Sequence, residues 1–186
     1  YYKHKMENQL SMTTNDKTEL FALVELSIEC SNLPSLDKLS KSDPVVAIYQ
    51  KNGENYDFVG KTECLQNKKS PKFTTSVITK YFFEEEQIFK FVVYDVDDEK
   101  KLSIDRSGVR GAEIIGEYEC SLASIINARK VGKSTIEEKL KKFKKNVLKD
   151  LKSGMIKVCA VVEQKSNIMC VIQMKGKNIS GKDRHL

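Results

Sequence analysis

Two segments of the chain concentrate acidic side chains at short spacing. The first spans residues 36–44 and the second spans residues 94–113, each next to an apolar, strand-like run. Their acidic residues include Asp37, Asp43, Asp95, Asp97 and Glu113. Calcium is a hard cation that takes about six to eight oxygen ligands, several of them carboxylates. Because clustered carboxylates repel one another, such a cluster either stays well solvated or holds a metal ion.

The second acidic segment does not fit the helix–loop–helix calcium motif. Its sixth position is Lys100, where that loop needs glycine. Two acidic segments are a more specific signal than one, provided that both lie at the same end of the fold. The first follows the first predicted strand and the second follows the fifth, so a path of alternating strands brings them to one end. The alternative is a pair of acidic loops that are merely solvated.

Residue types for other site chemistry are scarce. The two histidines, His4 and His185, lie at the chain ends, so the folded middle cannot assemble a serine–histidine, cysteine–histidine or zinc–histidine site. We therefore expect no enzyme activity. Five scattered cysteines without a CxxC pair argue against a disulfide framework and for a reducing, intracellular compartment. No apolar stretch approaches the roughly 20 residues of a membrane helix, and we expect no signal peptide.

Strand-like runs separated by turn signals must position the acidic segments. The predicted strands cover residues 20–28, 44–49, 56–64, 73–83, 87–94, 113–122 and 154–162. Turn signals such as Asn52-Gly53 and Ser70-Pro71 fall between them. Many strands at short spacing are typical of an all-β sandwich. A chain of 186 residues is long enough to bury a core without disulfides or metal.

One stretch, Thr135 to Leu151, is predicted to be a basic amphipathic helix inserted before the last strand. Its apolar residues recur at helical steps: Ile136, Leu140, Phe143, Val147, Leu148 and Leu151. Between positions 130 and 152 there are nine lysines and three acidic residues. The net charge of this segment is therefore +6, which equals the net charge of the whole chain. The helix packs on the sandwich or lies on a membrane surface, and the pattern leaves both open. Aromatic residues suited to base stacking are lacking there, so we expect no nucleic-acid partner.

The chain divides into three predicted parts. Residues 1–17 form a flexible polar tail, residues 18–164 form the domain, and residues 165–186 form a linker and the first strand of a truncated second copy. The last assignment rests on an internal repeat, in which residues 24–33 match residues 170–179 at an offset of 146. A strand with a broken loop cannot fold alone, so we expect the natural protein to be longer.

The ordered motifs of the chain resemble those of C2 domains, the calcium- and phospholipid-binding sandwiches of eight strands. The motifs are Leu-Asp-x5-Asp-Pro, Ser-Pro-x-Phe, Val-Tyr-Asp-x-Asp and Ile-Ile-Gly-Glu. Leu-Ser-Lys-Ser-Asp-Pro and Lys-Tyr-Phe-Phe-Glu-Glu are similar to the first C2 domain of copines. Copines carry two such domains and then a von Willebrand factor A-like domain. The resemblance implies an eight-stranded antiparallel β-sandwich with phospholipase-like strand order.

The resemblance also carries calcium ligands onto matching positions. The implied carboxylates are Asp37, Asp43, Asp95 and Asp97, and the implied backbone carbonyls are those of Leu36 and Val96. The fifth carboxylate of the family is usually an aspartate, and here it is Glu113. Because glutamate reaches further, one calcium site is expected to be weak or rearranged, with Asp98 or Asp105 as substitutes.

Docking on an anionic phospholipid membrane is the implied function. The candidate lipid contacts are Lys38, Leu39, Lys61, Lys68, Lys69, Leu102 and Ile104. The apolar ones insert into the membrane or pack on their own loop, and the lysines bind lipid or are simply solvated. We expect a monomeric cytoplasmic module that moves to plasma or internal membranes with calcium. The alternatives are a calcium-independent C2 module that binds an acidic protein partner, and a targeting domain from a lipid enzyme.

Overall fold

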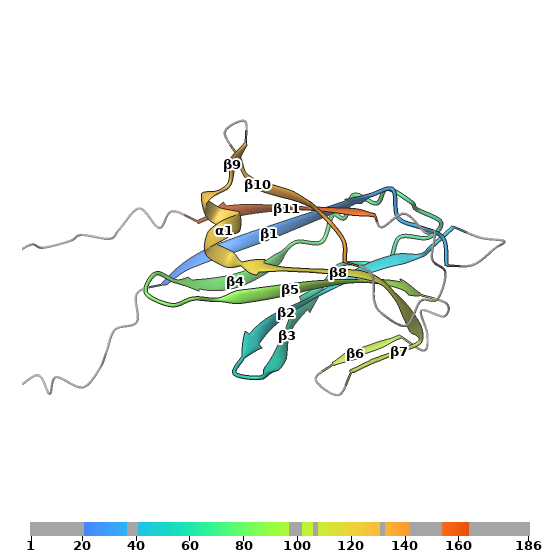
Figure 1. Cartoon of the computed structure of the whole chain (residues 1–186), viewed down its shortest axis with the longest axis horizontal. Coiled ribbons are helices and arrows are strands. Elements are labelled where there is room, and N and C mark those ends of the chain that lie inside the picture. Colours follow the sequence, from blue (N-terminus) through green and yellow to red (C-terminus); the bar gives the residue numbers. More distant parts are fainter. Residues whose placement is uncertain are drawn as a thin grey trace, which may run out of the picture.

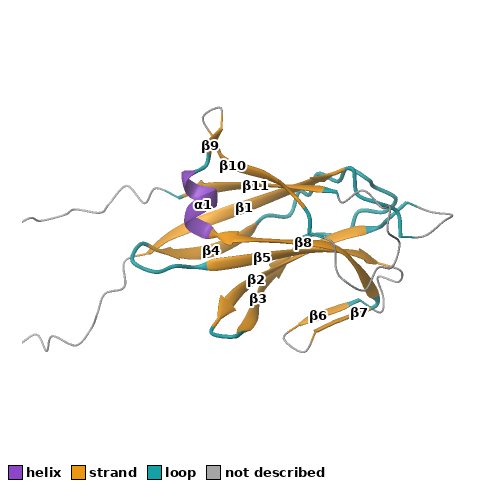
Figure 2. Ribbon diagram, in the orientation of Figure 1, coloured by secondary structure: helices purple, strands orange, loops and turns teal. Residues whose placement is uncertain are grey.

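The computed structural model describes residues 21–36, 41–96, 102–105, 108–130, 133–141 and 154–163. Within these ranges the chain forms two stacked β-sheets, a separate two-stranded hairpin and a short helix (Figures 1 and 2). The elements are β1 (Phe21–Ser31), β2 (Pro44–Asn52), β3 (Asn55–Lys61), β4 (Val77–Phe82), β5 (Ile88–Val96), β6 (Ser103–Asp105), β7 (Gly108–Arg110), β8 (Ala112–Ser121), α1 (Leu122–Asn127), β9 (Arg129–Lys130), β10 (Lys133–Lys139) and β11 (Met155–Val162). The predicted tail, 1–17, and the predicted second-copy segment, 165–186, lie outside the described residues.

The two layers of the sandwich are antiparallel sheets. One has the strand order β4-β1-β11-β10-β9, and the other has the order β3-β2-β5-β8. Because β9 has only two residues, each layer consists of four long strands. The first long strand, β1, pairs with the last, β11. The prediction of an eight-stranded antiparallel sandwich is confirmed.

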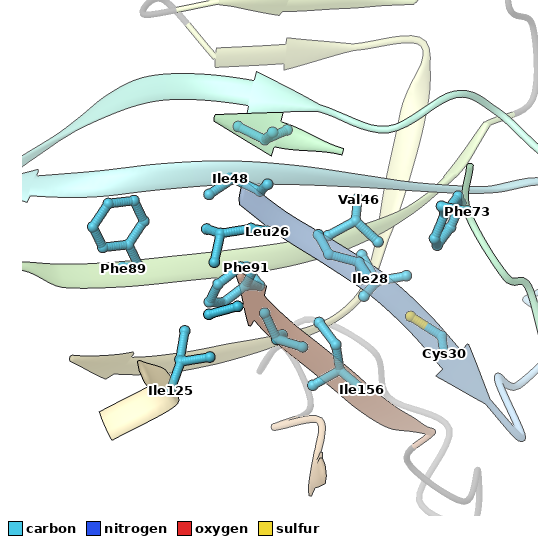
Figure 3. Packing of buried hydrophobic residues seen from close by; sticks show 14 of the residues in the cluster. Leu26, Ile28, Cys30, Val46, Ile48, Phe73, Phe89, Phe91, Ile125 and Ile156 are labelled. Carbon is cyan, nitrogen blue, oxygen red and sulfur yellow. The ribbon is translucent and has the colours of Figure 1, made fainter. Parts of the chain in front are cut away.

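Alternation along the strands builds the core between the layers. In β1, Val24, Leu26 and Ile28 are buried, whereas the residues between them are at most partly buried. From the facing sheet, Phe89 and Phe91 of β5 are fully buried in the same cluster (Figure 3). Alternate residues of a strand point to opposite faces, so this pattern fixes which face of each strand turns inward.

One edge strand of each sheet has backbone groups that are hydrogen-bonded to residues outside the sheet. At the edge strand β4, the buried side chain of Gln87 accepts from the Phe82 amide (2.8 Å) and donates to the Lys80 carbonyl (2.9 Å). At the edge strand β8, the Lys141 amide donates to the Glu117 carbonyl (2.8 Å), and the Glu117 amide donates back (3.0 Å). These bonds occupy backbone groups that would otherwise be open to pairing with another chain.

The predicted helix over 135–151 is wrong in its first part. Lys133–Lys139 is strand β10, antiparallel to β11, with Ile136 opposite Val158. Leu140 follows and is buried at 3% exposure, and residues 142–153 are outside the described ranges. The edge of β11 needs a pairing partner, and this tertiary requirement outweighs a helical spacing that rested here on Ile136 and Leu140 alone.

The helix that the described residues do contain is α1, which was not predicted. It begins directly after β8, where the Ser121 hydroxyl accepts a hydrogen bond from the Ser124 amide at 3.1 Å. Such a serine cap satisfies one of the free amides of the first helical turn. Leu122 and Ile125 are the buried side of this short helix. Among the described residues, no helix is long and apolar enough to span a membrane.

Candidate functional site

The strand register brings the described acidic residues to one end of the sandwich. Pro44, the first residue of β2, lies opposite Asp95 near the end of β5, and Asp95 lies opposite Glu113 near the start of β8. Asp43 immediately precedes Pro44, so Asp43 lies just before β2 at the same end of the sheet as Asp95 of β5 and Glu113 of β8. For the described residues of both acidic segments, the prediction that they lie at the same end is confirmed (Figure 1).

Asp95 holds the two acidic segments together. Its side chain is buried, with the residue only 7% exposed, and its Oδ1 accepts from the Asp43 amide at 2.7 Å. In return, the Val96 amide donates to the Asp43 carbonyl at 3.1 Å. A buried carboxylate needs hydrogen-bond donors to offset the loss of water, and the Asp43 amide is one. The backbone of Asp43 is therefore fixed relative to Asp95.

The Asp43 carboxylate is held by a different part of the chain. Its Oδ1 accepts from the Asn67 amide at 2.7 Å, and Asp43 is partly buried whereas Asn67 is exposed. The Cys64 thiol also lies 3.6 Å from the Asp43 carbonyl oxygen. The loop between β3 and β4 thus approaches the first acidic segment, and nothing in the sequence pattern had assigned Asn67 to the site.

The remaining predicted ligands are distributed between the described and undescribed residues. Glu113 is exposed at the edge of β8, and Leu36 and Val96 are both described. Asp37 and Asp97 lie outside the described residues. The described part of the chain by itself contains no group of three acidic, histidine or cysteine residues that could hold a metal ion. The side chains of Asp43, Asp95 and Glu113 offer only oxygen atoms as metal ligands, and a hard cation such as calcium prefers oxygen ligands.

The predicted lipid-contacting lysines fall into two places. Lys68 and Lys69 are exposed on the loop next to Asp43, where the Lys68 amide donates to the Ser42 carbonyl at 3.0 Å. The Lys69 carbonyl accepts from the Leu33 amide at 2.8 Å, which ties this loop to the end of β1 as well. Lys61 is exposed at the end of β3, opposite Ala47. Lys38 and Leu39 lie outside the described residues.

Leu102 and Ile104 pack against the protein. Leu102 directly precedes the hairpin β6–β7 and Ile104 belongs to it, and both are partly buried against a second apolar cluster on the outer face of the sheet β3-β2-β5-β8. The buried members of this cluster are Val45, Ala47, Tyr49, Val92, Tyr94 and Val96. Of the two alternatives for these side chains, membrane insertion or packing, the contacts favour packing.

Comparison with known proteins agrees with this geometry. The C2 domain family model matches residues 22–137, more than half of the chain. The chain belongs to the C2 domain family. Among solved structures, this C2 domain is similar to a C2 domain of plant Extended Synaptotagmin 1, with a TM-score of 0.53 and 16% identity over 76% of this chain and 94% of that one. Human GIVD cytosolic phospholipase A2 also has a TM-score of 0.53, at 14% identity over 79% of this chain and 17% of the enzyme.

Curated relatives of this C2 domain include copines. Copine-B of Dictyostelium discoideum is 36% identical over 162 residues, which cover 86% of this chain and 28% of Copine-B. Protein BONZAI 1 of Arabidopsis thaliana is 38% identical over 129 residues, which cover 66% of this chain and 21% of that protein. The predicted resemblance to copines is confirmed, and the chain spans about a quarter of the length of these relatives.

Proposed function

We propose that this C2 domain binds calcium at the end of the sandwich that carries Asp43, Asp95 and Glu113, and that calcium makes this end bind anionic phospholipid. The observation that supports the proposal is the register of a C2 domain, which pairs Asp95 with Glu113 on one side and with Pro44, the residue after Asp43, on the other. In a longer copine-like protein, the domain would recruit the other domains to intracellular membranes.

The proposed ligands come from the end of the sheet that carries Asp95 and Glu113 and from the two acidic segments next to it. The carboxylates are Asp37, Asp43, Asp95, Asp97 and Glu113, and the carbonyls are those of Leu36 and Val96. When bound, calcium supplies positive charge and open coordination positions for lipid phosphate oxygens. The chain's own contribution is to keep Asp95 buried and bonded to the Asp43 amide, so that one part of the ligand set keeps its position before any metal binds.

The charge of the loops explains why docking would depend on calcium. Five carboxylates give this end of the domain a charge near −5, which repels an anionic membrane surface. Two divalent ions would offset about four of those charges. The exposed Lys68 and Lys69 lie on the loop beside Asp43, and each lysine near an anionic leaflet contributes about 1 kcal/mol. Once calcium has offset most of the carboxylate charge, the positive charge of these two lysines would dominate at the surface that faces the membrane.

Co-sedimentation with phosphatidylserine vesicles tests the proposal. We expect this C2 domain to pellet with calcium and to stay in solution with chelator. The double variant Asp43→Asn plus Asp95→Asn should lose calcium-dependent pelleting. A matched control is Asp57→Asn, because Asp57 lies in β3 near the opposite end and bonds to the Asn52 side chain at 2.8 Å. The control should pellet like the unchanged chain.

Two other results would count against calcium-triggered docking. Binding in chelator that falls steeply with salt would assign membrane binding to the lysines alone. Absence of pelleting in both conditions, together with binding to an acidic protein, would favour a protein-interaction module.

A further inference from the structure

The loop between β3 and β4 has an unusual backbone conformation next to the proposed calcium end. Asn67 has a φ of 55°, in the left-handed region that residues with a β-carbon rarely adopt. The Asn67 amide points at the Asp43 carboxylate, with 2.7 Å between the nitrogen and Oδ1. A charge-assisted hydrogen bond of this length is stronger than a neutral one and fixes the orientation of the carboxylate.

Bonds on both sides of Asn67 hold it in this place. The Leu65 amide donates to the Pro44 carbonyl at 3.2 Å, and the Lys68 amide donates to the Ser42 carbonyl at 3.0 Å. The amides of residues 65, 67 and 68 thus bond to residues 44, 43 and 42 in turn. The Asn67 amide bonds to the Asp43 side chain, whereas the flanking amides bond to backbone carbonyls, and the left-handed φ of Asn67 sets the direction in which the chain continues to Lys68. With a negative φ at Asn67 the chain would continue in another direction, so the bonds from the Asn67 and Lys68 amides could not both keep their present geometry.

We propose that Asn67 is a positioning residue for calcium binding, and that its left-handed backbone orients the Asp43 carboxylate for the metal. The inference rests on the proposed calcium function. The Asn67 amide occupies Oδ1, which leaves Oδ2 free of this bond. A carboxylate with one oxygen held loses less rotational freedom when the other oxygen takes a ligand. The same bond offsets part of the negative charge of Asp43 in the calcium-free domain.

The coupling also acts in the opposite direction. If the Asn67 turn favours the calcium-bound position of Asp43, calcium bound to Asp43 must favour the Asn67 turn by the same factor. Lys68 and Lys69 follow that turn directly in the chain. Calcium would therefore hold these two lysines in place beside the lipid phosphate, in addition to neutralising the carboxylates.

Asparagine is among the few residues that suit this position. Asparagine and glycine adopt the left-handed conformation readily, whereas a β-branched residue there is strained. Valine at position 67 would shift the loop to conformations that do not keep the bonds from residues 67 and 68 to Asp43 and Ser42 together, which loosens the hold on the Asp43 carboxylate. Apparent affinity falls in proportion to the population of the competent conformation. We expect calcium affinity to fall about tenfold in Asn67→Val and to recover to within about twofold of the unchanged chain in Asn67→Gly.

The test measures calcium affinity by titration calorimetry on the full chain without lipid. The matched control is Gly53→Val, which places the same strained residue at a φ of 60° in the turn between β2 and β3, far from Asp43. Gly53→Val should lose folding stability but keep calcium affinity within about twofold, since its strain does not reach the site. Equal affinity in Asn67→Val and in the unchanged chain would overturn the positioning role and leave the calcium function intact. Absence of calcium binding by the unchanged chain would overturn both.

A second readout does not depend on calcium. In chelator, amide hydrogen exchange at Asn67 should speed up about tenfold in Asp43→Ala, which removes the acceptor, while exchange at Lys68 should change little because its acceptor is the Ser42 carbonyl. Unchanged exchange at Asn67 would show that the hydrogen bond to Asp43 contributes nothing, and would overturn the proposal whatever the calorimetry gives.

Discussion

Replacing Glu63 with glutamine removes the charge that holds the loop after β3 against the segment before β4. The Glu63 Oε1 accepts from the Thr74 amide at 2.6 Å and from the Thr74 hydroxyl at 2.9 Å, and Oε2 accepts from the Thr75 amide at 3.0 Å. A glutamine cannot accept at both ends, because one oxygen becomes an amide nitrogen that can only donate. We therefore expect Glu63→Gln to lose the bond from the Thr75 amide or the bond from the Thr74 amide.

The pKa of Glu63 gives the size and the pH dependence of the effect. Desolvation by itself raises this pKa, but the hydrogen bonds from Thr74 and Thr75 together outweigh it and lower the pKa from 4.5 to about 2. The full shift corresponds to about 3 kcal/mol. Because the side chain is only partly buried, solvent screening reduces this to about 1–2 kcal/mol. A lowered pKa stabilises the fold above pH 4.5, and the stabilisation is lost as the pH falls toward 2.

The assay is urea unfolding of the unchanged chain and of Glu63→Gln at several pH values. At neutral pH the free energy of unfolding should be about 1–2 kcal/mol lower in Glu63→Gln, and the difference should shrink steadily below pH 4.5. Glu54→Gln, in the exposed turn between β2 and β3, is the control and should have a small effect at neutral pH. A difference for Glu63→Gln that stays constant down to about pH 2.5 would refute the reasoning, because it could not come from the charge.

Three further predictions concern the packing of the sandwich. Gly154→Ala should lower the free energy of unfolding by about 1–3 kcal/mol, because the new β-carbon would lie 2.7 Å from Leu33 Cδ2; an unchanged melting temperature would contradict this. Gln87→Leu should cost about 2 kcal/mol through the lost bonds to the Phe82 amide and the Lys80 carbonyl, and a neutral effect in urea unfolding would be the contrary result. Burial raises the pKa of the Cys30 thiol to about 12, so a thiol reagent at about pH 8 should modify Cys30 only after denaturant is added, and rapid labelling of the folded chain would show that this strand opens.

Much of the fold could be predicted because strand alternation is a local signal. The predicted strand over residues 20–28 alternates at its end, and Leu26 and Ile28 are buried in β1 as such a pattern requires. The shared end of the two acidic segments followed from counting strands, and the pairing of Pro44, next to Asp43, with Asp95 confirms it for the described residues. These predictions depend only on the spacing of apolar residues within each strand and on the order of the strands along the chain. Both can be read from a single sequence.

The errors and omissions depend on contacts distant in sequence. The spacing of Ile136 and Leu140 fits a helix. Ile136 lies in a strand instead because β10 pairs with β11, whose edge would otherwise be unpaired. The contact of Asn67 with Asp43 joins residues from different loops and uses a backbone amide, which every residue type except proline has. The one local signal was the asparagine, since this residue tolerates a left-handed backbone, but asparagine is common in turns of every kind.

The register also explains how the second acidic segment can be long without displacing its ends. Val96 pairs with Ala112, one step beyond the pair formed by Asp95 and Glu113, so the ladder between β5 and β8 continues up to the residues where the segment leaves and returns. The hairpin β6–β7 lies within that segment and packs on the outer apolar cluster instead of on the acidic edge. The position of Asp95 relative to Glu113 is therefore set by sheet hydrogen bonds and not by the length of the segment. It follows that shortening the hairpin β6–β7 should expose the outer apolar cluster and lower the free energy of unfolding. The distance between Asp95 and Glu113 should stay the same.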